Sequence, residues 1–178
     1  TEYVDKELPV WDLFEQIELL LEGTQVLDEY SNVDLEWSIG HGSLARIPWI
    51  ALLDERETDT NQSGRYLVYL FREDMSGLYL AYSQGASRPT DLYGDAVGEA
   101  LLQTRAERIR RRASGLRESD FSLDSGIDLV TDTGRGRRYE KSTAAYKFYE
   151  SGQLPSEEEL FADLDSLLDV YDSHVGHG

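Results

Sequence analysis

The sequence predicts an α+β fold: a mostly antiparallel central sheet, flanked by helices, in a single domain. Apolar residues recur at helical spacing near both ends of the chain and once in its middle. Between the first two of these stretches lie four short segments with strand-like composition. The 178 residues are 40% hydrophobic, which is enough for one sizeable core, and no linker or repeat divides them. This order of elements is typical of one α+β domain over residues 1–178.

The first half begins with a helix and two strands. Apolar residues fall on one stripe from residue 10 to 21, and Gly23 follows as a stop signal. Residues 33–39 alternate between apolar and polar, which predicts a half-buried strand. Residues 49–53 are continuously apolar, which predicts a buried strand. The polar stretch 54–64 is rich in turn formers and is predicted as a loop.

A hairpin follows this loop. Residues 66–71 and 78–82 are rich in tyrosine and leucine, and a short polar turn separates them. Tyr66 and Leu70 are four residues apart, so they point to the same face of their strand. If Trp49 begins the neighbouring strand, these three side chains line one concavity.

The second half opens with a loop and a helix. Residues 84–93 contain glycine, proline and aspartate and are predicted as a loop. Residues 96–112 have helical spacing. Gly94 or Asp95 is the expected cap, and Gly115 is the expected end.

The stretch that follows is less regular. Residues 119–136 show no clear periodicity, apart from a short strand expected near residues 127–130. Residues 139–149 are rich in aromatic side chains. We expect them to close the sheet.

The last helix has a clear start. Ser156 is followed three residues later by Glu159, which is the pattern of a capping box. Residues 173–178 are expected to form a disordered tail. His174 and His177 have a metal-like spacing, but a disordered end explains them better than a metal site does.

The charge of the chain is strongly negative and unevenly spread. There are 35 acidic and 17 basic residues, a net charge of −18, and only Lys6, Lys141 and Lys147 are lysines. Such a composition is typical of a protein from a high-salt cytoplasm, whose carboxylates hold water; an acidic interaction surface is the alternative. Residues 96–147 carry 11 basic and 8 acidic side chains, a net of +3. One face can therefore be positive, although −18 overall opposes nucleic-acid binding.

Arginines gather in two places. The first group crowds the end of the predicted helix: Arg108, Arg110, Arg111 and Arg112. Complementation of the helix dipole and a phosphate clamp both explain this group, and both alternatives stay open. The second group lies among glycines, in an expected flexible loop just before Tyr139: Arg135, Arg137 and Arg138. A loop that joins arginine to an aromatic side chain is a common nucleic-acid contact element.

Several chemistries are excluded. The chain has no cysteine, and therefore no disulfide, thiolate metal site or cysteine nucleophile. It has neither a phosphate-binding glycine loop with its lysine nor an H-E-x-x-H zinc motif. Glu140 and Lys141 lack the spaced acidic partner of nuclease clusters. We expect no catalytic residue, no metal, no cofactor and no membrane contact, with the cytoplasm as the default location.

A turn in which glycines flank a histidine is the most informative local feature. Gly40 and Gly42 allow positive φ and close backbone approach on both sides of His41. Pro48 can begin a strand but not sit inside one, so Trp49 lies at a strand start, near a rim. The turn is either a tight connection before a core strand or a loop tip that grips a flat ligand.

Four stretches of this half match a known pattern, at residues 38–42, 47–53, 64–71 and 78–82. They resemble the N-terminal DNA-recognition domain of McrB-type proteins, the targeting subunits of type IV restriction systems that depend on modified cytosine. Weaker similarity returns at residues 137–142 and in the last helix. The resemblance covers nearly the whole chain.

The resemblance implies a function and a site. The family's domain flips a modified cytosine out of duplex DNA and holds it in a pocket. By position, the pocket residues are Trp49, Tyr66, Leu70 and Tyr139. His41, with Gly40 and Gly42, corresponds to a wedge that fills the space left by the base; a related domain has tyrosine there. The implied phosphate-binding residues are Arg46, Arg135, Arg137, Arg138 and Lys141. The implied partners are double-stranded DNA with modified cytosine and a nucleotide-hydrolysing motor and nuclease on other domains or subunits.

Three functions remain in competition. The first is a non-catalytic reader of methylated or hydroxymethylated cytosine, which targets a restriction complex to foreign DNA. Aromatic stacking, at about 1–3 kcal/mol per base, is the right size to offset the cost of unstacking. The second is an acidic protein–protein interaction module without DNA binding. The third is a stand-alone nuclease.

Overall fold

The central sheet has five strands in the order β1-β2-β3-β4-β5, and each neighbouring pair is antiparallel. The computed structural model describes residues 9–41 and 43–175. The strands are Val33–Ser38 (β1), Trp49–Asp54 (β2), Arg65–Phe71 (β3), Gly77–Gln84 (β4) and Ala145–Glu150 (β5). Four of them follow one another along the chain, whereas β5 joins the sheet after a long helical excursion. The predicted α+β class with an antiparallel sheet in one domain is confirmed.

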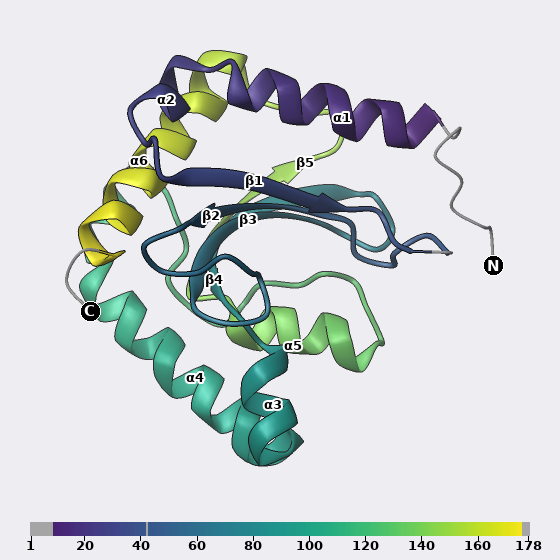
Figure 1. Cartoon of the computed structure of the whole chain (residues 1–178), viewed down its shortest axis with the longest axis vertical. Coiled ribbons are helices and arrows are strands. Elements are labelled where there is room, and N and C mark those ends of the chain that lie inside the picture. Colours follow the sequence, from purple (N-terminus) through teal and green to yellow (C-terminus); the bar gives the residue numbers. More distant parts are fainter. Residues whose placement is uncertain (1–8, 42, 176–178) are drawn as a thin grey trace.

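Helices cover both faces of this sheet (Figure 1). They are Pro9–Glu22 (α1), Gln25–Asp28 (α2), Ser87–Tyr93 (α3), Asp95–Arg112 (α4), Gly134–Ser142 (α5) and Glu157–Val175 (α6), with a 3-10 helix at Ser114–Ser119 (η1). In the described part of the chain, no helix has both the length and the apolar character needed to span a membrane.

Alternate strand residues point into two cores, one on each face. Leu52, Leu67 and Leu80 are fully buried on the face that α1 and α6 cover. Ala51 and Val68, each one residue away along its strand, are buried on the opposite face. Because side chains alternate along a strand, this two-sided burial makes the central strands apolar throughout.

The clearest sequence signals are confirmed. α1, α4, α6 and the first four strands lie where their patterns predict them, within one or two residues, except that β4 runs on to Gln84 and α6 to Val175. The capping box of α6 is formed: the Ser156 amide donates to Glu159 Oε2 at 3.0 Å, and the Glu159 amide donates to Ser156 Oγ at 3.2 Å. The short α2 has no counterpart among the predictions.

The predicted loop at residues 84–93 is wrong, because most of it forms α3. Pro89 lies in the first turn of this helix, where a missing amide hydrogen costs little. Thr90 Oγ1 donates to the carbonyl of Ala86. Gly98 of α4 then lets the two helices approach so closely that a Cβ there would lie 2.7 Å from Thr90 Cα.

The predicted flexible loop around Arg135 is also wrong, because residues 134–142 form α5. Thr133 caps this helix by accepting a hydrogen bond from the Gly136 amide at 3.0 Å. Gly136 is required by close packing, since a Cβ there would lie 2.3 Å from Thr131 Cγ2. Strand β5 therefore begins only at Ala145, rather than at residue 139.

Three smaller expectations are corrected as well. Residues 127–130 form no strand, although Ile127 and Leu129 are buried against the sheet. Helix α4 ends at Arg112, and Gly115 lies within η1. Helix α6 continues to Val175, so the expected tail starts too early; residues 176–178 lie outside the described residues.

Candidate nucleic-acid interface

A cleft of about 530 Å³ opens between the β1–β2 loop, the start of β2 and the first turns of α5. Segments from the two halves of the chain meet here. Among its lining residues are six that the resemblance implies for DNA binding: Gly40, His41, Arg46, Trp49, Arg135 and Tyr139.

Two aromatic side chains form one wall of this cleft. Trp49 begins β2 and is paired in register with Leu70 of β3. Tyr139 reaches the same place from α5, and both rings pack on the core that contains Tyr66 and Leu70. Tyr66 and Leu70 are only 3% and 2% exposed and do not line the cleft. The alternation-based expectation of a shared face is met, but only Trp49 and Tyr139 are within reach of a ligand.

Tyr139 in this wall and Tyr66 beneath it are both neutral. Burial raises the pKa of Tyr66, and the neighbouring Tyr139 adds to that effect. Burial also raises the pKa of Tyr139, against the opposing influence of Arg135 and Arg138. The wall therefore offers apolar ring surface and hydroxyl groups rather than charge.

The glycine turn also lines the cleft. Gly40 has a φ of +116°, and a Cβ there would lie 2.1 Å from the Ser43 carbonyl oxygen. The turn is closed by the Ala45 amide, which donates to the Ile39 carbonyl at 2.7 Å. His41 is exposed at the tip of this turn. Gly42, the third residue of the expected wedge, lies outside the described residues.

Arg46 is the cleft arginine with the most partners. Its Nε donates to Glu73 Oε1 at 2.6 Å, and one of its terminal nitrogens lies 2.9 Å from Asp132 Oδ1. More than half of the side chain remains exposed. Glu73 Oε2 is buried without a hydrogen-bond partner among the described residues. A phosphate that binds Arg46 must therefore compete with two carboxylates.

The arginines of α5 point in different directions because the helix fans them around its axis. Arg135 is exposed and lines the cleft, one turn before Tyr139. Arg137 donates to the Asp132 carbonyl at 2.6 Å. Arg138 donates to Thr90 Oγ1 at 3.2 Å, and Lys141 forms an ion pair with Glu99 of α4.

Of the five expected phosphate-binding residues, the cleft therefore brings together Arg46 and Arg135 and leaves out the other three. The side chains of Arg138 and Lys141 attach α5 to α3 and α4 instead. Sequence reasoning missed the carboxylates Glu73 and Asp132, because nothing local marks them as partners of Arg46. Thr133 also lines the cleft and was not predicted as a site residue. Its residue type carried a usable signal, because threonine is a preferred N-cap and Thr133 caps α5.

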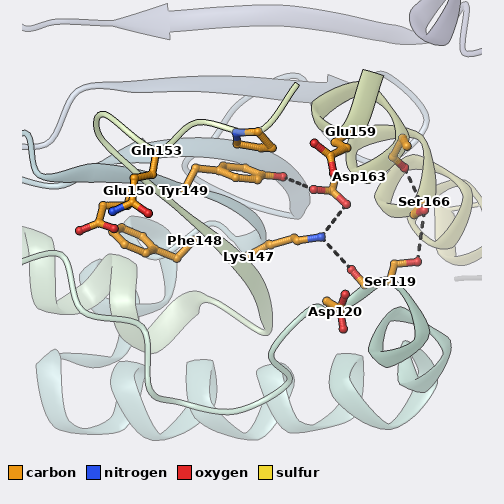
Figure 2. Close-up of a pocket in the computed structure, with 12 residues that line it drawn as sticks. Ser119, Asp120, Lys147, Phe148, Tyr149, Glu150, Gln153, Glu159, Asp163 and Ser166 are labelled. Atoms are coloured by element: carbon orange, nitrogen blue, oxygen red, sulfur yellow. Dashed lines mark hydrogen bonds and ion pairs between the residues drawn. The ribbon is translucent and has the colours of Figure 1, made fainter. Parts of the chain in front are cut away.

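A larger cavity of about 650 Å³ lies beside β5, η1 and α6 (Figure 2). Figure 2 shows the Lys147 ammonium and the Tyr149 hydroxyl both pointing toward the Asp163 carboxylate, at 2.7 and 2.8 Å. Lys147 also donates to the Ser119 carbonyl at 3.2 Å. These polar groups satisfy one another, so the cluster ties β5 to α6 and η1.

The remaining candidates for chemistry are structural. His174 is 4% exposed, and its Nδ1 lies 3.0 Å from the Tyr82 hydroxyl. Its expected companion, His177, lies outside the described residues. In the two described ranges, no three His, Asp or Glu side chains are grouped so as to hold a metal ion.

The fold and the cleft define a class: a small α+β domain with an open cleft beside its antiparallel sheet. The family model of the MrcB-like N-terminal domain matches residues 5–176, so the chain belongs to this family, the McrB-like N-terminal domain of type IV restriction proteins. Domains of this family are DNA-recognition modules. A comparison with curated protein sequences finds no match.

Proposed function

We propose that this domain reads modified cytosine in duplex DNA by base flipping and performs no catalysis itself. One observation carries the proposal: Trp49, Tyr139 and the glycine turn that bears His41 line the same cleft. In this proposal the flipped base enters between the two rings and His41 fills its place in the duplex. Tyr66 and Leu70 lie beneath the two rings and support them from the core.

The charges of the cleft fit a phosphate contact made by a few arginines close to the flipped base. Arg135 is exposed and lines the cleft, so it can bind a DNA phosphate without first leaving another partner. Arg46 joins only by leaving Glu73 or Asp132, which makes its contribution dependent on salt. Arg138 and Lys141 would hold phosphates only by leaving their partners on α3 and α4, and Arg137 only by leaving the Asp132 carbonyl.

The domain would act as the targeting part of a larger system in the cytoplasm. A nucleotide-hydrolysing motor and a nuclease, on other domains or subunits, would cut the DNA that it marks. The excess of carboxylates would keep the domain soluble in a high-salt cell.

A binding titration tests the proposal. Fluorescence anisotropy is measured with duplexes that differ only in one cytosine, which is plain, methylated or hydroxymethylated, at several salt concentrations. We expect tighter binding of at least one modified duplex. Trp49→Ala and Tyr139→Ala should each weaken it by about 5- to 150-fold, because stacking contributes about 1–3 kcal/mol per base.

Tyr93→Ala is the matched control, since Tyr93 is 58% exposed on α3, outside the cleft. It should bind like the wild type. If Trp49→Ala and Tyr139→Ala fold normally and bind every duplex like the wild type, the cleft is not the reading site. Equal affinity for all three duplexes would refute the reading of a cytosine modification, and no binding to any of them would favour the protein-interaction module instead.

A further inference from the structure

A second cavity gathers arginines at the far end of the sheet from Trp49. It has a volume of about 390 Å³ and lies between α4, the start of β3 and the end of α6. Arg105, Arg108 and Arg112 line it from one face of α4. In Figure 1 this end of α4 approaches the end of α6. We call this the α4 arginine cavity.

The cavity is separate from the aromatic cleft. Arg65 lines it at the first position of β3, whereas the residue paired with Trp49 is Leu70, five positions further along the same strand. At about 3.4 Å per residue, this places the two sites about 17 Å apart along the strand. A ligand of the α4 arginine cavity is therefore a different chemical group from the flipped base.

The three α4 arginines of this cavity have no ion-pair partner among the described residues. Glu57 is the one carboxylate among the lining residues, and Arg65 Nε already donates to it at 2.7 Å. In a chain with a net charge of −18, three neighbouring arginines without a carboxylate partner indicate a site for an anionic ligand.

The positive surface extends beyond the cavity. A smaller cavity of about 140 Å³ shares Gly64 and Arg105 with it and adds Arg88, which is exposed. Its lining includes no carboxylate among the described residues.

Helix stability does not account for this arrangement. Arg108 and Arg112 are four residues apart, a spacing at which like charges destabilise a helix. The helix dipole favours cations only in the last turn, and Arg105 lies further back. Arg110 shows what a structural arginine does here, because it donates to the carbonyls of Ala144 and Thr143, both at 3.0 Å.

We propose that the α4 arginine cavity binds a phosphate-bearing ligand, whose oxygens contact Arg105, Arg108 and Arg112. Guanidinium groups pair with phosphate through two parallel hydrogen bonds, and three of them on one concave surface suit a group with several charged oxygens. A volume of about 390 Å³ is within the range of small-ligand sites. Free polyphosphate groups and the backbone of nucleic acid share this chemistry.

The test is an NMR titration of the ¹⁵N-labelled chain at constant ionic strength, with inorganic pyrophosphate in one arm and a plain DNA duplex in the other. We expect saturable shifts of the amide signals of residues 105–112. The double variant Arg105→Gln/Arg108→Gln should weaken binding at least tenfold, because it removes the paired, charge-assisted hydrogen bonds of two guanidinium groups.

A second double variant, Arg111→Gln/Arg117→Gln, removes the same charge outside the cavity and should change the affinity by less than about twofold. Shifts with pyrophosphate alone identify a small phosphate ligand, and shifts with the duplex alone identify the nucleic-acid backbone. No saturable shift in either arm overturns the proposal, and so does an equal loss in both double variants. Trp49→Ala should leave these shifts unchanged, so failure here is distinguishable from failure of the base-reading function.

Discussion

Replacement of Gly40 by alanine tests whether the turn that carries His41 has the conformation on which the interface depends. Gly40 has a φ of +116°, which residues with a side chain rarely adopt, at a cost of about 1–3 kcal/mol. The added Cβ would also lie 2.1 Å from the Ser43 carbonyl oxygen and 2.6 Å from the Ala45 amide nitrogen. Both are backbone atoms, so the turn itself must move.

We expect Gly40→Ala to lower the free energy of unfolding by about 2–4 kcal/mol, since overpacking adds about 1–3 kcal/mol to the strain and the loop relaxes in part. The Ala45 to Ile39 hydrogen bond at 2.7 Å should be lost with it. Urea unfolding at equilibrium measures the change, and thermal unfolding should show a drop of about 2–4 °C per kcal/mol.

Variants of two other glycines distinguish the cost of backbone strain from the cost of steric crowding. Gly94 has a φ of +79° and a ψ of 165°, but no atom lies within 4 Å of the position that an added Cβ would take, so Gly94→Ala should cost only the backbone strain, about 1–3 kcal/mol. Gly134 begins α5 with the same open space and no positive φ, so Gly134→Ala should stabilise by about 0.5–1 kcal/mol. Of the three variants, only Gly40→Ala should weaken DNA binding. A Gly40→Ala variant as stable as the wild type would refute the reasoning.

Three further predictions concern stability. Asp163→Ala leaves Lys147 and the Tyr149 hydroxyl without their shared partner, and urea unfolding should show a loss of about 2–4 kcal/mol; a neutral result would contradict the tie between β5 and α6. Burial, together with Arg112 and Arg65, lowers the pKa of His174, so the folded state resists its protonation. The free energy of unfolding should therefore fall as the pH drops below about 6.5, by at most about 1.4 kcal/mol per pH unit, and His174→Gln should flatten that slope. If the carboxylates serve a high-salt cell, the thermal midpoint should rise between low and molar salt, and a constant midpoint would count against this.

The parts of the fold that sequence predicts well are those with a local physical cause. The hairpin of β3 and β4 follows from alternating side chains around a short polar turn, and the start of α6 follows from Ser156 and Glu159. Helix α5 could not be found in this way. Its glycines and arginines have the composition of a loop, and it is held by contacts such as Gly136 against Thr131, whose geometry exists only after folding.

The same distinction applies to the candidate site. Strand periodicity placed Trp49, Tyr66 and Leu70 on one face, but it carried no information on depth, and two of them are buried. The partners of Arg46 were also out of reach of local patterns, because Glu73 lies 27 positions away in the sequence. Ion pairs between loops depend on the completed topology, so charge patterns alone overestimate the number of free arginines.

Base flipping itself gives the most direct test of the central claim. A duplex with the fluorescent base 2-aminopurine beside one methylated cytosine brightens when the neighbouring base leaves the stack. We predict that the wild-type domain increases this fluorescence and that Trp49→Ala abolishes the increase while Tyr93→Ala keeps it. Tight binding of the modified duplex without any rise in fluorescence would contradict the account.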